Sequence, residues 1–248
     1  MVFHYDDPAD REVAGFIASA LALGRVSGIL GAGTAALGAL GPRPAETLRS
    51  CPAGELRERC EGFVYRFFTA DHLANFLAAV GSLLREFGSL ERAFLSGHAA
   101  DAETTLPAAE AFLARFHARA EGPIAILLPL PGRGGSLKRL HLFLRWMVRS
   151  DCIDPGGWNS VLPAQLIVPL DTHMHRLARE LGLTARRSCD ARTALEITAA
   201  FRGVDSADPV RFDFSLTRLG IHPDLGYATL FGLSDGGWSE APPEPDRR

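Results

Sequence analysis

The chain has 248 residues, of which 47% are hydrophobic and 22% charged, a composition typical of a folded globular protein. Its net charge of −3 argues against a protein that coats nucleic acid over its whole surface, but leaves room for a local basic face. The longest charge-free stretch, 26–42, is interrupted by glycines and falls short of the roughly 18–20 residues of a membrane helix. The N-terminal segment is acidic, unlike a secretory signal. We therefore expect a cytoplasmic protein without a membrane partner.

Hydrophobic periodicity predicts helices along almost the whole chain. The predicted helices are Pro8–Ala22, Val26–Leu40, Asp71–Phe87, Ser89–Leu95, Leu106–Ala120, Ser136–Arg149, Thr172–Leu181, Ala191–Phe201, Pro209–Leu219 and Pro223–Leu230. Asp208 followed by Pro209 is typical of a helix start. No linker composition interrupts residues 1–233, so we expect one all-α domain there, followed by a disordered tail at 234–248.

The cysteine and histidine spacings give no sign of a metal site. The four cysteines are Cys51, Cys60, Cys152 and Cys189, and they form neither a C-x-x-C pair nor an iron–sulfur loop. His173 and His175 would point apart on a helix. We expect reduced thiols, no metal and no cofactor.

Lysine is almost absent from the sequence. Lys and Arg together number 26, and a count of the rows gives 25 arginines and the single lysine Lys138. Because arginine serves where only charge is needed, a surviving lysine can be one that is required as a primary amine. The alternative is that it persisted by chance.

Lys138 follows a glycine-rich turn at residues 130–137. Glycines let backbone amides approach an anion closely, and the start of a helix adds a favourable dipole. Residues 122–150 contain no acidic side chain. These features indicate a phosphate contact, although a helix pair with a solvated basic side would show the same pattern. The candidate DNA-binding residues are Gly132, Arg133, Gly134, Gly135, Ser136, Arg139 and Arg145.

The helix expected at 136–149 is apolar on more than one face, as for a helix inside a bundle. Lys138 shares one side of this helix with His141, Leu142 and Arg145. Partial removal from water at such a position would favour the neutral, nucleophilic amine.

Asp171 begins another predicted helix, after a proline at 169 that keeps the approach extended. As an N-cap, its carboxylate would face unpaired amides, which favour the ionised form. A fixed carboxylate near a lysine can accept a proton from an attacking amine or from water. A simple helix cap is the alternative role.

Two of these motifs resemble the helix-hairpin-helix DNA glycosylase superfamily. Residues 130–134 (LPGRG) are similar to its hairpin, and 169–173 (PLDTH) are similar to its catalytic aspartate motif. The run 138–149 (KRLHLFLRWMVR) resembles more closely a poorly characterised bacterial family of the same fold, as do the segments 208–210 and 212–214. The resemblance covers about 5–222 and implies a two-lobed helical fold with a cleft and a helix-hairpin-helix element.

The resemblance also implies an activity. A damaged base in double-stranded DNA would be flipped into the cleft, Lys138 would attack the sugar as a Schiff-base nucleophile, and Asp171 would assist. If Lys138 were misplaced, Asp171 would activate water instead. Asp171 follows Lys138 by 33 positions, which is similar to the spacing in archaeal 8-oxoguanine DNA glycosylase and implies an oxidised purine as substrate. We expect a monomer.

The base pocket is assigned less directly. The candidates are Asp213, Phe143, Trp146 and His141. The resemblance makes Asp213 a reader of the base, although a cap or ion pair is the plainer role. The aromatic side chains, with Trp158, could stack on a base or belong to the core. Arg25 and Arg66 could contact phosphate or pair with an aspartate.

Two readings compete with a glycosylase that has β-lyase activity. One is a non-catalytic protein that retains the fold and binds DNA or RNA, and the other is a purely structural helical protein. A lyase requires the Lys138 amine and the Asp171 carboxylate to lie within roughly 4–6 Å, the range in which one charge acts on another.

Overall fold

The computed structural model describes residues 2–221. The predicted helix at Pro223–Leu230 and the predicted tail at 234–248 lie outside this range. The described part is mostly helical, which confirms the all-α fold class. None of its helices is both long and apolar enough to cross a bilayer.

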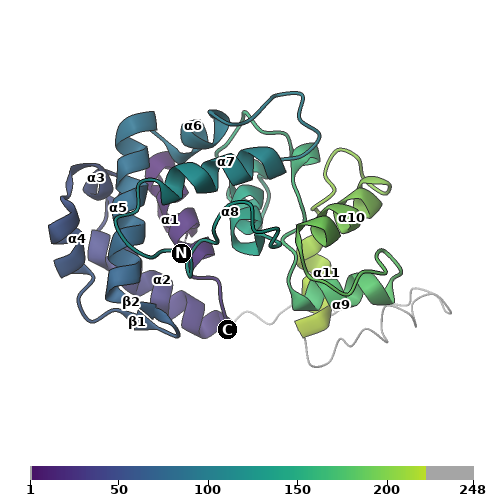
Figure 1. Ribbon diagram of the computed structural model, residues 1–248, viewed down its shortest axis with the longest axis horizontal. Coiled ribbons are helices and arrows are strands. Elements are labelled where there is room, and N and C mark those ends of the chain that lie inside the picture. The colour runs from purple at the N-terminus through teal and green to yellow at the C-terminus, as the bar shows by residue number, and fades with distance from the viewer. Residues whose placement is uncertain (1, 222–248) are drawn as a thin grey trace, which may run out of the picture.

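Eleven α-helices, two short 3-10 helices and one two-stranded antiparallel hairpin make up residues 2–221 (Figure 1). The elements are η1 Val2–His4, α1 Pro8–Ala20, α2 Val26–Leu40, α3 Pro44–Ser50, α4 Ala53–Arg59, β1 Val64–Tyr65, β2 Phe68–Thr69, α5 Ala70–Phe87, α6 Leu90–Leu95, α7 Leu106–His117, α8 Lys138–Val148, η2 Pro163–Gln165, α9 Thr172–Glu180, α10 Ala191–Arg202 and α11 Asp213–Ile221.

The long amphipathic helices begin and end close to their predicted positions, and α2 has the predicted bounds. The prediction at Pro209 was wrong. The Asp205 carboxylate accepts hydrogen bonds from the amides of Ala207 and Asp208, which closes a turn there, and α11 begins only at Asp213. Helices α3 and α4 and the hairpin were not predicted.

Phenylalanine side chains fill the centre of the larger helical group. Phe16 on α1 is fully buried and lies 4.9–5.7 Å, centroid to centroid, from four other rings. These rings belong to Phe76 on α5, Phe112 and Phe116 on α7, and Phe143 on α8. Burying each such ring contributes roughly 1.5–3 kcal/mol. Because Phe16 contacts rings from α5, α7 and α8, α1 is the helix around which these three pack.

Two buried carboxylates of α1 hold the starts of other helices. Asp10 accepts a hydrogen bond from the Ala45 amide in the first turn of α3. Glu12 accepts hydrogen bonds from the amides of Leu90 and Glu91 at the start of α6. Both helices are short, and α1 satisfies amides that their own turns leave unpaired.

Helices α9, α10 and α11 form a second group beside the larger one (Figure 1). The two groups share one hydrophobic core, which runs from Val13 on α1 to Ile197 on α10 and Val210. Helix α8 lies between them and brings its N-terminal turn next to the start of α9. This arrangement positions the site described next.

Candidate functional site

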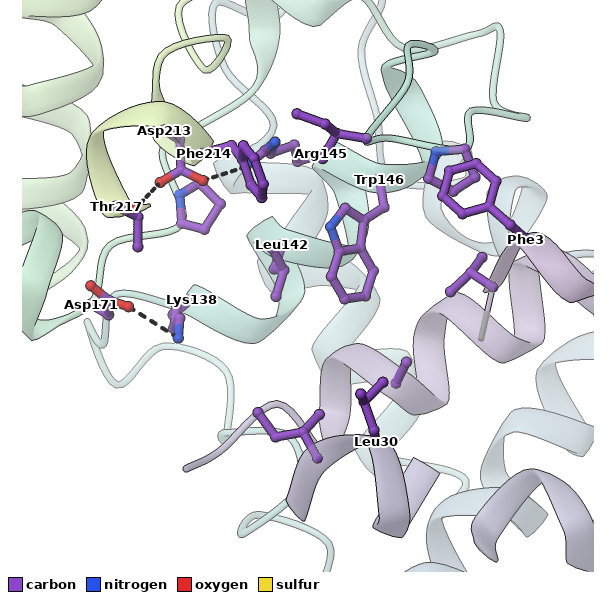
Figure 2. Close-up of a pocket in the computed structure, with 16 residues that line it drawn as sticks. Phe3, Leu30, Lys138, Leu142, Arg145, Trp146, Asp171, Asp213, Phe214 and Thr217 are labelled. Carbon is purple, nitrogen blue, oxygen red and sulfur yellow. Dashed lines mark hydrogen bonds and ion pairs between the residues drawn. The ribbon is translucent and has the colours of Figure 1, made fainter. Parts of the chain in front are cut away.

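A cavity of about 430 Å³ lies where α8 meets α2, α11 and the start of α9. This volume is within the range of ligand pockets. Most of the lining is apolar, with polar side chains at one end (Figure 2). The lining residues are Val2, Phe3, Ala18, Ile29, Leu30, Lys138, Leu142, Arg145, Trp146, Ile153, Pro155, Pro169, Asp171, Asp213, Phe214 and Thr217.

Lys138 and Asp171 face each other at the polar end of the cavity (Figure 2). Nζ of Lys138 lies 3.2 Å from Oδ2 of Asp171, so the expected proximity is confirmed. The two side chains are 35% and 21% exposed. Each is therefore accessible from the cavity while being partly shielded from bulk water.

Local structure orients both side chains. Asp171 caps α9, because its Oδ1 accepts hydrogen bonds from the amides of His173 and Met174 at 3.0 and 2.9 Å. This leaves Oδ2 directed toward Lys138. Leu137 has a φ of 48°, in the left-handed region, so α8 begins abruptly at Lys138, two residues after the predicted start. The Lys138 amine and the Asp171 carboxylate thus both come from helix N-termini.

A buried ion pair forms the upper wall of the cavity. Nη1 of Arg145 on α8 lies 2.5 Å from Oδ2 of Asp213 on α11, and Thr217 donates a long hydrogen bond to the other oxygen. Burial raises the pKa of Asp213, and the Arg145 guanidinium opposes that shift. Nη2 of Arg145 has no hydrogen-bond partner among the described residues.

Further ion pairs continue from Arg145 away from the cavity. Its Nε donates to Oδ2 of Asp154, which also accepts from Arg149. Arg149 in turn pairs with Asp151 and Asp208. Arg145 is only 2% exposed, and carboxylates inside the protein neutralise its charge. Its predicted contact with DNA phosphate stays a prediction, which these buried ion pairs do not favour.

Arg139 is the second predicted DNA contact that has a structural role instead. Its guanidinium donates to the carbonyl oxygens of Ala20 and Ile126 and lies 5.8 Å from the centroid of the Phe68 ring. Burial lowers the pKa of Arg139. The side chain therefore joins α8 to α1 and to the β1–β2 hairpin.

The glycine turn is ordered by the elements around it. The amide of Gly132, expected to face a phosphate, donates to a carboxylate oxygen of Glu110 at 2.6 Å. The Gly134 carbonyl accepts from the Ala191 amide, and Gly135 pairs with Asp190 in an isolated β-bridge. The segment between α7 and the turn contains a single helical turn near residues 124–128 and no regular helix.

Two residues of the turn, Arg133 and Ser136, have surroundings that are compatible with the predicted DNA contact. Arg133 is exposed and has no ion-pair partner in the part of the chain that the structure describes. Ser136 donates its hydroxyl to the carbonyl of Leu170, one residue before Asp171. The turn and the start of α9 are therefore tied together beside the Lys138–Asp171 pair.

Of the predicted base-pocket residues, Trp146 and Asp213 line the cavity, whereas Phe143 and His141 do not. Phe143 is fully buried against Phe16, so its assignment was wrong. His141 is 1% exposed, and burial lowers its pKa to about 4. Both lie on the side of α8 that faces the core.

Trp158 also belongs to the core. Its ring packs edge-on against Phe143, and its Nε1 donates to Oε1 of Glu12 at 2.8 Å. It lines no part of the Lys138 cavity.

The residues Phe3, Leu30, Phe214 and Thr217 line the cavity but were not among the predicted site residues. Phe214 lies beside the Arg145 guanidinium, with its ring centroid 6.0 Å from the guanidinium carbon (Figure 2). Phe3 and Leu30 face the cavity from the opposite side. Thr217 could have been found, because it lies four residues after Asp213, which is one turn of a helix. Phe3 and Leu30 carry no such signal.

One thiol lies near the pair. Cys189 is exposed, and burial of part of the side chain together with the charge of Asp171 raises its pKa, while Lys138 opposes the shift. Within residues 2–221, no group of three or more His, Cys, Asp or Glu side chains is arranged to hold a metal ion.

Comparison with known proteins gave one match. The model of a family described as "Protein of unknown function (DUF2400)" matches residues 1–222. No curated protein and no solved structure matches the chain.

Proposed function

Since the chain belongs to the DUF2400 family, whose description assigns no activity, we propose from its site that it is a DNA base-excision glycosylase with β-lyase activity. Its proposed substrate is an oxidised purine such as 8-oxoguanine in double-stranded DNA. The observation that carries the proposal is the 3.2 Å contact between the single lysine and Asp171 at the polar end of a base-sized cavity.

In the proposed reaction, Nζ of Lys138 attacks C1′ of the flipped nucleotide after losing a proton. Oδ2 of Asp171 is the nearest acceptor that the geometry offers for that proton. The C1′–N bond breaks, its electron pair leaves with the base, and the base takes up a proton. Asp171 also stabilises positive charge on the sugar ring in this step.

The lyase step, which cleaves the DNA strand, depends on the primary amine of Lys138. Opening of the sugar ring gives an iminium between Nζ and C1′, which makes the C2′ proton acidic. Loss of that proton breaks the C3′–O bond and releases the 3′ phosphate, and water then hydrolyses the iminium. A hydroxyl or carboxylate nucleophile could not form this intermediate, so the chemistry requires a primary amine.

The rest of the cavity suits a planar base. Trp146 and Phe214 offer aromatic surface, and the Asp213 carboxylate supplies a polar group at one edge. Asp213 is the proposed reader of the base, held in place by Arg145. The resemblance to helix-hairpin-helix glycosylases supports the same assignment through the motifs at 130–134 and 169–173.

The test is borohydride trapping with duplexes that carry 8-oxoguanine, uracil or an abasic site. We expect a covalent protein–DNA band that is lost in Lys138→Gln. Lys138→Arg is the matched control, because it keeps the charge beside Asp171 but cannot form a Schiff base. An adduct of equal yield in Lys138→Gln would come from the N-terminal amine and would contradict the assignment.

Two other outcomes separate the alternatives. Base release without an adduct, lost in Asp171→Asn, would retain the glycosylase and remove the lyase step. Binding of duplex DNA by the unaltered protein without release of any base would favour the non-catalytic DNA- or RNA-binding protein.

A further inference from the structure

The β1–β2 hairpin carries a large apolar side chain and a basic one in solvent at its tip. Phe67 is 65% exposed, and the Arg66 guanidinium carbon lies 5.7 Å from the centroid of its ring. Arg66 has a φ of 53°, in the left-handed region, where a two-residue hairpin turn favours glycine or asparagine. A bulky residue therefore occupies the one position of this turn whose backbone favours glycine, as is common where a strained position has a function.

The hairpin is anchored below this tip. Phe68 is fully buried, and the Tyr65 ring lies 6.0 Å from it. The Tyr65 hydroxyl donates to the Leu23 carbonyl at 2.7 Å, which ties β1 to the segment before α2. These contacts of Tyr65 and Phe68 hold the hairpin in place, so the Phe67 side chain stays in solvent.

The anchored base of the hairpin adjoins the start of α8. The Phe68 ring lies beneath the guanidinium of Arg139, the residue that follows Lys138. On the other side, the hairpin packs on α2, whose Leu30 lines the cavity. The base of the hairpin therefore contacts both α2 and α8, the two helices whose residues Leu30 and Lys138 line the cavity.

The charges near the tip match a polyanion. Arg25, at the N-cap of α2, and Arg66 form no ion pair with a carboxylate within residues 2–221, so the predicted alternative of pairing with an aspartate is not realised for them. The Arg66 guanidinium thus lies against the exposed Phe67 ring. Arg25 follows Gly24, where a Cβ would lie 2.8 Å from Nη1 of Arg66, so a second guanidinium without an ion pair comes from the backbone next to Arg66. Phosphates beside stacked bases are the ligand that this combination fits.

We propose that the hairpin tip is a wedge for duplex DNA. Phe67 stacks on the base next to the vacated position, and Arg25 and Arg66 bind the flanking phosphates. Filling that gap offsets the unstacking that base flipping costs. The inference rests on the proposed function in one respect, since it assumes that Lys138 acts on an extruded nucleotide.

Binding can be measured without catalysis, using a duplex with a stable tetrahydrofuran abasic analogue and 2-aminopurine beside it. We expect Phe67→Ala to weaken binding roughly tenfold and to reduce the change in 2-aminopurine fluorescence. Phe67→Tyr should restore both. Val64→Ala is the matched control, because Val64 is 74% exposed on the same hairpin and should leave binding unchanged.

Arg66→Gly tests the phosphate contact and suits the backbone, because glycine adopts the left-handed region freely. It should lower the slope of log affinity against log salt by about one. Equal urea midpoints for the variants and the unaltered protein would show that the fold is intact.

The wedge is overturned if Phe67→Ala binds like the unaltered protein, or if Val64→Ala loses as much affinity. It is also overturned if the unaltered protein binds single-stranded RNA of the same sequence as well as the duplex, or binds no DNA. Phe67-dependent binding without any trapped adduct would contradict the lyase chemistry alone. A normal Lys138 adduct with unchanged binding by Phe67→Ala would contradict the wedge alone.

Discussion

Arg145 and Asp213 form an ion pair between α8 and α11, with side chains only 3% and 8% exposed, at the wall of the cavity that contains Lys138. Arg145 also pairs with Asp154, which is completely buried. Removing one partner of such a pair leaves a charge without compensation in a region that water does not reach.

Arg145→Ala should therefore lower the free energy of unfolding by about 3–5 kcal/mol, measured by urea denaturation at pH 7. Arg43→Ala is the control, because Arg43 and Glu46 pair on the surface with 72% and 57% of their side chains exposed. That variant should change stability by less than about 1 kcal/mol. Equal losses in the two variants would contradict the structural role of the buried pair.

Asp171 has a structural and a chemical role that two substitutions can separate. Asn is as good an N-cap as Asp, so Asp171→Asn should keep the stability of α9 while slowing base release by about 10²-fold or more. Asp171→Ala should slow base release as much and also cost about 1 kcal/mol of stability. Single-turnover kinetics and urea midpoints distinguish them. Unimpaired base release in Asp171→Asn would remove the residue from the reaction.

Gly81 allows α5 to approach α3 closely. A Cβ at this position would lie 2.3 Å from the Leu48 carbonyl oxygen, so Gly81→Ala should force the helices apart and cost about 1–3 kcal/mol. Gly38 on α2 has open space around it, and Gly38→Ala should instead stabilise the protein by about 0.4–1 kcal/mol. Thermal or urea unfolding should give opposite signs for the two variants.

His141 should make stability depend on pH below neutrality. Burial lowers its pKa from 6.5 to about 4, so between these values the unfolded chain binds more protons than the folded protein. The contribution is fully present above pH 6.5 and is lost as the pH falls toward 4, by about 3 kcal/mol in total.

The measurement compares His141→Leu with the unaltered protein in urea at pH 7 and pH 4.5. Burial raises the pKa values of Glu12 and Asp213, which gives the opposite pH trend, but both carboxyls are present in both proteins and cancel in the difference. The variant should lose less stability on acidification. Parallel losses would show that His141 is protonated in the folded state.

Hydrophobic periodicity was enough to locate the long helices, because each buries one apolar face whatever its partners are. It did not predict α3, whose seven residues are supported by Asp10 from another helix. The hairpin was missed because Arg66 and Phe67 at its turn are not turn-forming residues. Short elements that depend on distant groups leave little local signal.

The residues of the candidate site also fall into those that local sequence predicts and those that it does not. Lys138 and Asp171 could be predicted because each stands at a helix start with a recognisable motif. The environment of Arg145 could not, because its partners Asp154 and Asp213 follow it by 9 and 68 residues. Whether an arginine faces a phosphate or a buried carboxylate is decided by tertiary packing, which periodicity does not contain.

The two carboxylates of α1 affect the order in which the chain can fold. Helices of six or seven residues are not stable alone, since too few hydrogen bonds offset the cost of nucleation. Asp10 and Glu12 supply acceptors to α3 and α6 across 35 and 78 residues of sequence. Helices α3 and α6 therefore become stable only once α1 has docked, and closing those loops sets a kinetic barrier that local helix formation alone would not impose.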